Sequence, residues 1–159
     1  MHRVVFAILF CFLFVYAQDK RQLTTPEETI ALLTEIKTEA ITIGKGSKEI
    51  HSFIDPYCSM SQMYIKHLFK NQKRMEEKYT IHLYFYELKR KKSRLMIENI
   101  YDAENQIFMI KQVMVEKQKI DIEEIGDLDI DEKIAKIAVR AEKIGVYKRP
   151  FIITNGKAK

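Results

Sequence analysis

The spacing of apolar and polar positions along the chain predicts alternating helices and strands. Residues 25–41 have a helical spacing, with Thr25 suited to the N-cap and Pro26 to the first helical position. Residues 49–55 and 80–88 are dense in β-branched and aromatic side chains, which predicts two strands. The first strand has apolar and polar residues on both faces, as in a strand covered on both sides. Between the two strands, helical spacing begins at Cys58.

About fifty residues after the second strand also have helical spacing. Residues 129–145 have the clearest boundaries, with Asp129 or Asp131 as the N-cap and Gly145 as the stop. Residues 147–156 then predict a proline-led strand that enters an Asn-Gly turn. The order helix, strand, helix, strand, helices, strand, without repeats or a linker, indicates one α/β domain.

The first seventeen residues depart from this pattern. A short basic start precedes an apolar run over residues 4–15, and Ala17 precedes a polar stretch, which predicts a secretory signal peptide cleaved after Ala17. An uncleaved membrane anchor is the alternative, although the run is shorter than the roughly 20 residues of a spanning helix. Cys11 follows the bulky Phe10, which disfavours lipidation. Cleavage leaves Cys58 as the only cysteine, so a disulfide-stapled domain is excluded.

The net charge and the spacing of the histidines bear on two further classes of function, nucleic-acid binding and metal binding. The chain carries a net charge of +5, and removal of Arg3 with the signal leaves 26 basic against 22 acidic residues. This mild excess, without a recognised binding motif, gives no indication of nucleic-acid binding. His51, His67 and His82 form no metal-ligand spacing with Cys58, so we expect neither a metal site nor a cofactor.

Two distant motifs provide the main functional indication. FIDPYCSMS, residues 53–61, places Cys58 just past a buried strand and at the start of a helix. IGVYKRPFIITNGK, residues 144–157, places Pro150 at the opening of a strand. Together they resemble the thioredoxin fold, particularly the exported disulfide isomerases of the DsbC and DsbG type. Their motif reads strand, Asp-Pro, any residue, then Cys-x-x-Cys.

The resemblance covers residues 43–157 and implies how the chain is organised. A helical segment over residues 18–42 precedes a thioredoxin-like domain over residues 43–159, which carries a helical insertion at residues 93–144. The resemblance also implies that Pro150 is cis and faces Cys58. The chain stops soon after the Asn-Gly turn, so the usual last strand and C-terminal helix are expected to be missing.

Cys58 is the predicted nucleophile of this motif. At a helix start, unpaired N–H groups and the positive end of the dipole favour a thiolate over a thiol. Arg149, which stands where the family usually has Thr or Val, is expected beside Cys58 and would act in the same direction. We predict that Arg149 and Pro150 shape a peptide groove. The rest of the predicted active-site motif is Asp55, Pro56, Tyr57, Ser59, Met60 and Ser61.

Ser61 replaces the second cysteine of the motif and determines how a mixed disulfide can be resolved. Cys58 can attack a substrate disulfide and form a mixed disulfide, but a hydroxyl cannot displace a thiolate to resolve it. The sequence therefore predicts a periplasmic monothiol interchange protein that acts on exported proteins with cysteines. Release of the substrate would then need a substrate thiol, an external thiol or a redox partner protein. The alternative is a non-catalytic binding or assembly factor in which Cys58 is a structural residue. No feature indicates an oligomeric state.

Overall fold

The computed structural model describes residues 22–159. The predicted signal peptide, its cleavage point and Cys11 lie outside the described residues. Within residues 22–159, no helix is long and apolar enough to cross a membrane.

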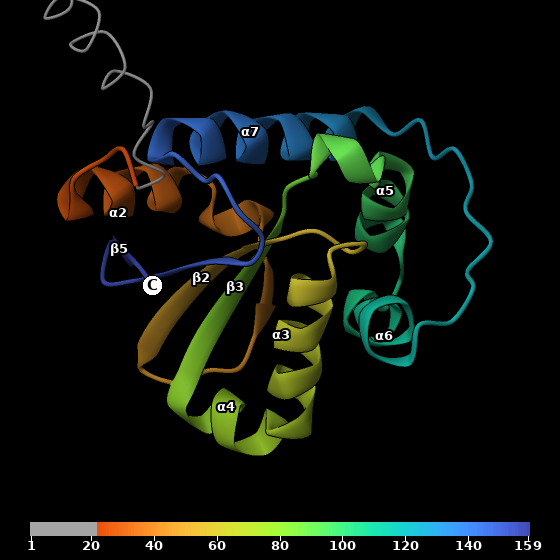
Figure 1. The fold of residues 1–159 in the computed structure, drawn as a ribbon, viewed down its shortest axis with the longest axis horizontal. Coiled ribbons are helices and arrows are strands. Elements are labelled where there is room, and N and C mark those ends of the chain that lie inside the picture. Colours follow the sequence, from red (N-terminus) through yellow and green to blue (C-terminus); the bar gives the residue numbers. More distant parts are fainter. Residues whose placement is uncertain (1–21) are drawn as a thin grey trace, which may run out of the picture.

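A five-stranded mixed sheet forms the centre of the molecule, with the strand order β1-β3-β2-β4-β5 (Figure 1). The neighbours β2 and β3 are parallel, and the other three pairs are antiparallel. The strands are β1 (Ile41–Ile43), β2 (Lys48–Ile54), β3 (Tyr79–Phe85), β4 (Phe151–Thr154) and β5 (Lys157–Ala158).

Helices cover both faces of this sheet (Figure 1). On one face, Tyr64 of α3 shares a hydrogen bond with Ser52 of β2 at 2.8 Å. On the other face, α7 contacts β3 and α2. The helical elements are α2 (Pro26–Glu35), η2 (Lys37–Glu39), α3 (Ser59–Lys70), α4 (Gln72–Lys78), η3 (Lys89–Lys91), α5 (Arg94–Asp102), α6 (Gln106–Ile110), the π-helix η4 (Lys111–Glu116) and α7 (Leu128–Ile144).

The two central strands are buried on both faces, as their sequences predict. A strand enclosed by helices on both sides has no solvent face, so apolar residues follow one another rather than alternate with polar ones. The fully buried apolar and aromatic side chains of β2 and β3 are Phe53, Ile54, Ile81, Leu83, Tyr84 and Phe85.

The helix ends follow local rules, with one correction. Thr25 and Glu28 form the reciprocal bonds of a capping box at the start of α2, which confirms Thr25 as the N-cap. Gly145 ends α7 with a φ of 84°, as predicted. The N-cap of α7 is Asp127 rather than Asp129 or Asp131, because its carboxylate accepts the N–H groups of Asp129 and Ile130.

The sequence did not predict two of the strands, β1 and β5. The first helix ends at Glu35, and Ile41 and Ile43 belong to β1, paired with Leu83 and Ile81 of β3. Both isoleucines are buried in this pairing, which outweighs the helical spacing that predicted Ile41 to be helical. The last strand is present as the two-residue β5, since the Asn-Gly turn brings Ala158 opposite Ile153.

The predicted helical stretch after β3 is interrupted. Residues 117–127 are irregular between η4 and α7, and Lys117 adopts a left-handed φ of 54°. Both ends of the Asn99 side-chain amide bond the backbone of Glu123, at 2.8 and 3.2 Å. These bonds fasten the irregular segment to α5.

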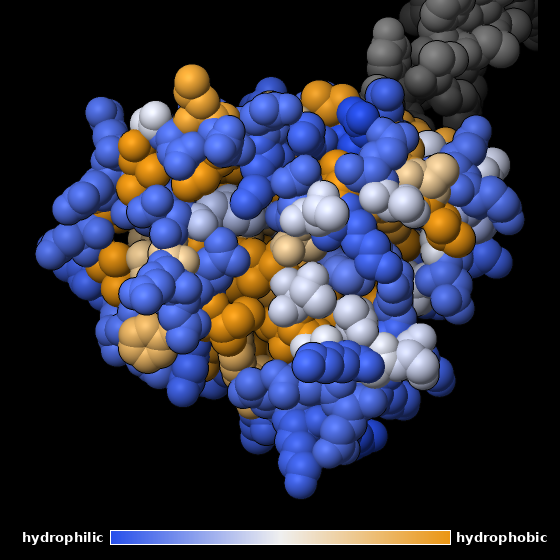
Figure 2. Space-filling view, turned by 180° about the vertical axis from the view of Figure 1, so that it is seen from behind, coloured by the Kyte–Doolittle hydropathy of each residue, from blue (hydrophilic) through white to orange (hydrophobic). Residues whose placement is uncertain are grey.

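Hydrophilic side chains cover most of the molecule as seen from behind, and apolar surface gathers near the middle of that view (Figure 2). This distribution agrees with the separation of charged and apolar positions along the helices.

Candidate functional site

Cys58 lies between the end of β2 and the start of α3, as the motif predicts. It is the N-cap residue of α3, and its side chain makes no capping hydrogen bond. Its backbone N–H bonds the carbonyl of Asp55 at 3.1 Å, which closes a tight turn after the strand. The side chain is largely buried, with 8% of the residue exposed.

The loop before β4 closes over this cysteine. The Arg149–Pro150 peptide bond is cis, which confirms the prediction for Pro150. The thiol of Cys58 donates a hydrogen bond to the carbonyl oxygen of Arg149, with 3.3 Å between sulfur and oxygen. The fold therefore brings together two motifs that are 91 positions apart in the sequence.

The side chain of Arg149 makes its bonds elsewhere. The guanidinium donates to the carbonyls of Tyr86 at 2.7 Å, Glu87 at 3.1 Å and Lys148 at 3.1 Å. Burial lowers the pKa of this guanidinium, and Tyr86 and Asp55 oppose that shift. Arg149 thus contacts the Cys58 thiol through its backbone carbonyl. Its guanidinium holds the loop before β4 against the segment after β3.

The buried carboxylate of Asp55 stabilises the turn that precedes Cys58. Its side chain is fully buried, and one carboxylate oxygen accepts the N–H of Tyr57 at 2.8 Å. The other accepts the N–H of Leu88 at 2.7 Å and the hydroxyl of Ser93 at 2.6 Å. Three donors satisfy this buried carboxylate, so it holds the cysteine turn and residues 88–93 in one arrangement.

Ser61 also points inward. It is fully buried in the first turn of α3, and its hydroxyl accepts the N–H of Asp55 at 3.3 Å. Ser61, three residues after Cys58, is therefore a hydrogen-bonding group of the turn.

The remaining motif residues form the outer side of the turn. Pro56 is buried and its carbonyl accepts the side-chain amide of Gln62 at 2.8 Å. Tyr57 is half-buried, and burial followed by the charge of Asp55 raises its pKa. Ser59 and Met60 are exposed, Met60 by 56%.

The structure also brings together residues that sequence spacing did not connect. His51 of β2 and His82 of β3 are neighbours through the parallel strand pairing, and their rings stack with centroids 4.7 Å apart. Only the strand register could have revealed this pair, because 31 positions separate the two histidines. His67 is exposed on α3, on another part of the chain.

The sequence matches no family model and no curated protein. Solved structures nevertheless share the fold. ScsC of Proteus mirabilis, in a compact conformation, aligns with a TM-score of 0.67 and 12% identity over 96% of this chain and 82% of its own. The oxidised BdbD of Bacillus subtilis aligns with a TM-score of 0.59 and 16% identity over 77% of this chain and 84% of its own.

A third similar structure is the thiol-disulfide exchange protein α-DsbA2 of Wolbachia pipientis. It has a TM-score of 0.60 and 16% identity over 84% of this chain and 88% of its own. At these identities the likeness concerns the fold. The helix that starts directly after Cys58 and the cis-proline loop are features that the two motifs predicted, and the chain has a thioredoxin-like α/β fold.

Proposed function

We propose that the protein exchanges disulfides through a single thiol, that of Cys58. One observation carries this proposal: Sγ of Cys58 lies at the start of α3, 3.3 Å from the carbonyl of the residue before cis-Pro150. The similarity in fold to a thiol-disulfide exchange protein supports the same chemistry.

The reaction needs only the sulfur atoms of Cys58 and its substrate. The Cys58 thiolate attacks one sulfur of a substrate disulfide, so a bond forms between them and the second substrate sulfur leaves as a thiolate. A different substrate thiolate then attacks the substrate sulfur of this mixed disulfide and releases Cys58. No electrons are gained or lost overall, and the substrate disulfide has moved.

Ser61 restricts the protein to this exchange. Its hydroxyl is no leaving group or nucleophile for sulfur, and it is occupied with the N–H of Asp55. Release by an external thiol such as glutathione is the second route. Net dithiol oxidation or reduction is disfavoured, because residues 22–159 contain no second thiol to store the electron pair.

Exposed apolar side chains beside Cys58 suit an unfolded protein substrate. Met60 and Met63, in the first turns of α3, are exposed by 56% and 63%. Flexible methionine side chains adapt to varied apolar partners. Together with the predicted signal peptide, this supports exported proteins with cysteines as substrates and the periplasm as location.

The test uses the full chain with Cys11→Ala, in which Cys58 is the sole thiol. Oxidised glutathione is added, and the Cys58–glutathione adduct is followed by intact-protein mass. We expect faster adduct formation in native than in urea-denatured protein, because the folded site assists attack. Reactivation of scrambled ribonuclease with a glutathione buffer then measures isomerisation, and Cys58→Ala should abolish the protein-dependent part.

Slower adduct formation in the native state, together with no reactivation above the glutathione background, would contradict thiol exchange. In that case the alternative from the sequence, a non-catalytic binding factor with a structural Cys58, is the better account.

A further inference from the structure

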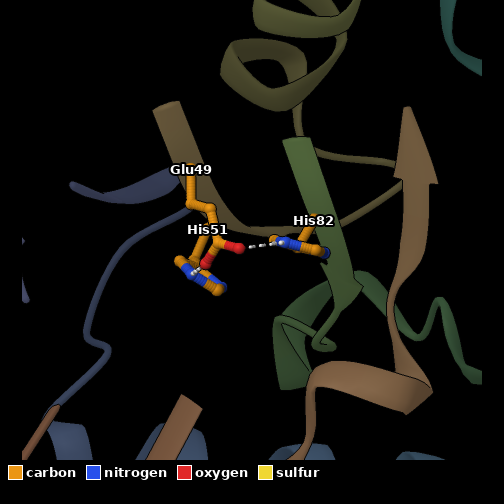
Figure 3. Close-up of side chains that lie close together, drawn as sticks. All are labelled: Glu49, His51 and His82. Carbon is orange, nitrogen blue, oxygen red and sulfur yellow. Dashed lines mark ion pairs between the residues drawn. The ribbon is translucent and has the colours of Figure 1, made fainter. Parts of the chain in front are cut away.

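Three side chains that ligate metals in other proteins converge on the sheet face beneath α2. Glu49 and His51 are two residues apart on β2 and so share a face, and the parallel register places His82 of β3 beside His51 (Figure 3). The Glu49 carboxylate points between the two rings. One oxygen lies 3.4 Å from Nε2 of His51, and the other lies 3.9 Å from Nε2 of His82.

One of these ligand atoms has no partner. Nε2 of His82 is buried without a hydrogen bond, and its side chain is only 4% exposed. Among buried side-chain nitrogen and oxygen atoms of residues 22–159, no other lacks a partner. An unpaired buried nitrogen is costly, so an atom of this kind calls for an explanation.

The other ring nitrogens are already engaged. Nδ1 of His51 lies 3.0 Å from the hydroxyl of Tyr84, and Nδ1 of His82 lies 3.1 Å from the hydroxyl of Thr42. Metal-binding histidines use one nitrogen for the metal and hydrogen-bond through the other, which fixes the tautomer. Both rings have this arrangement: Nε2 of His51 already lies beside a Glu49 oxygen, and Nε2 of His82 is unpaired near the other oxygen.

We propose that Glu49, His51 and His82 bind a zinc ion. Two imidazoles and a carboxylate are a known zinc ligand set, and they leave a fourth position for water or another ligand. The ligand atoms lie within 4.8 Å of one another, whereas ligands of a tetrahedral zinc are about 3.3 Å apart. Binding would therefore draw the ligand atoms closer together, and the Glu49 side chain, which is 46% exposed, has room to move.

The Glu49 and His51 side of the cluster borders open space. A cavity of about 350 Å³ is lined by Glu49 and His51 together with Leu33 of α2. It gives an entry path and room for a fourth ligand.

Lys37 competes with a cation for this position. Its ammonium lies 2.5 Å from a carboxylate oxygen of Glu49, on the exposed side of the cluster. Zinc binding would therefore displace Lys37 from that oxygen. Removal of the lysine charge should strengthen zinc binding at this cluster, whereas adsorption of zinc elsewhere on the surface should not change.

The zinc cluster is separate from Cys58. Glu49 lies near the start of β2 and Asp55 just past its end, roughly 20 Å along an extended strand. The inference therefore goes beyond the proposed thiol exchange and does not depend on it.

The test measures zinc affinity of tag-free full chain by competition with a chromogenic chelator. Cys11→Ala and Cys58→Ala remove both thiols, so sulfur cannot bind the metal. We expect one zinc per chain, an affinity loss of more than about 100-fold in His82→Gln, and a loss of about 10-fold in Tyr84→Phe. Lys37→Ala should bind more tightly, and His67→Gln, a surface histidine, should match the parent.

Two results would overturn the site. One is the absence of stoichiometric zinc binding at micromolar metal. The other is binding that stays the same in Tyr84→Phe and Lys37→Ala, which keep both histidines and test the cluster even if His82→Gln does not fold. Circular dichroism of each variant establishes folding before affinities are compared.

Discussion

The guanidinium carbon of Arg149 lies 3.8 Å from the centre of the Tyr86 ring, and the same guanidinium donates to the Tyr86 carbonyl. The Arg149 side chain therefore binds the segment that follows β3, and the backbone carbonyl of Arg149 accepts the hydrogen bond of the Cys58 thiol. The cis-proline loop is held against the rest of the site by a charged group. These contacts satisfy the charged group of Arg149, which is buried at 8% exposure.

We predict that Arg149→Lys destabilises the fold by about 2 kcal/mol, because an ammonium cannot serve three separate carbonyls or stack on the ring in the same way. Urea unfolding followed by circular dichroism measures the change. Lys148→Ala, an exposed neighbour, should remain within about 0.5 kcal/mol of the parent. Equal stability of Arg149→Lys and the parent would show that the guanidinium contacts contribute little to the free energy of unfolding.

Asp55→Ala should cost about 3 kcal/mol or more, since it leaves the N–H of Leu88 and the hydroxyl of Ser93 buried without their acceptor. The same change should free residues 88–93, a basic stretch, for cleavage by trypsin. Limited proteolysis with mass identification of the first cut tests this. Asp102→Ala, at an exposed carboxylate, is the matched control. A first cut elsewhere in both variants would argue against the anchoring role.

Ser61→Cys should convert the protein into a dithiol enzyme. The side chain stands one helical turn after Cys58, where a second thiol can resolve a mixed disulfide internally. We expect reduction of insulin by dithiothreitol to accelerate in this variant relative to the parent. The loss of the oxygen acceptor for the Asp55 N–H should cost about 1 kcal/mol. Ser59→Cys, on the exposed side of the turn, is the control and should not accelerate the reaction.

The sequence predicted those parts of the fold that follow local rules. The N-cap of α2, the glycine stop of α7 and the two central strands agree with the structure, and each depends on a few neighbouring residues. The cis-proline was instead implied by the family resemblance, and the structure contains it. The thioredoxin-like fold itself followed from two motifs at the expected separation.

The sequence could not show features that depend on strand register or on distant partners. Ile41 continues the helical spacing of residues 25–41, yet it belongs to a strand because it pairs with β3. The direction of the Arg149 guanidinium depends on carbonyls more than sixty positions away. His51 and His82 lie side by side only because of the parallel register of β2 and β3.

His51 gives the metal-free protein a pH-dependent stability. Burial is the main cause of its lowered pKa, and the charge of His82 adds to it; Lys37 acts in the same direction and Glu49 opposes it. Tyr84, which bonds its Nδ1, is neutral throughout the acidic range because burial raises its pKa. The folded pKa of about 4 lies below the unfolded value near 6.5.

With a chelator present, the free energy of unfolding should therefore fall as the pH drops from about 6.5 to about 4, because only the unfolded state binds the proton in that window. Below pH 4 both states bind it and the contribution of His51 becomes constant. The full shift corresponds to a loss of about 3 kcal/mol. Urea unfolding at pH 7, 5.5 and 4.5 measures it. His51→Gln should flatten this slope, whereas His67→Gln, at an exposed position, should keep it. Identical slopes in the two variants would mean that other groups govern the acid sensitivity.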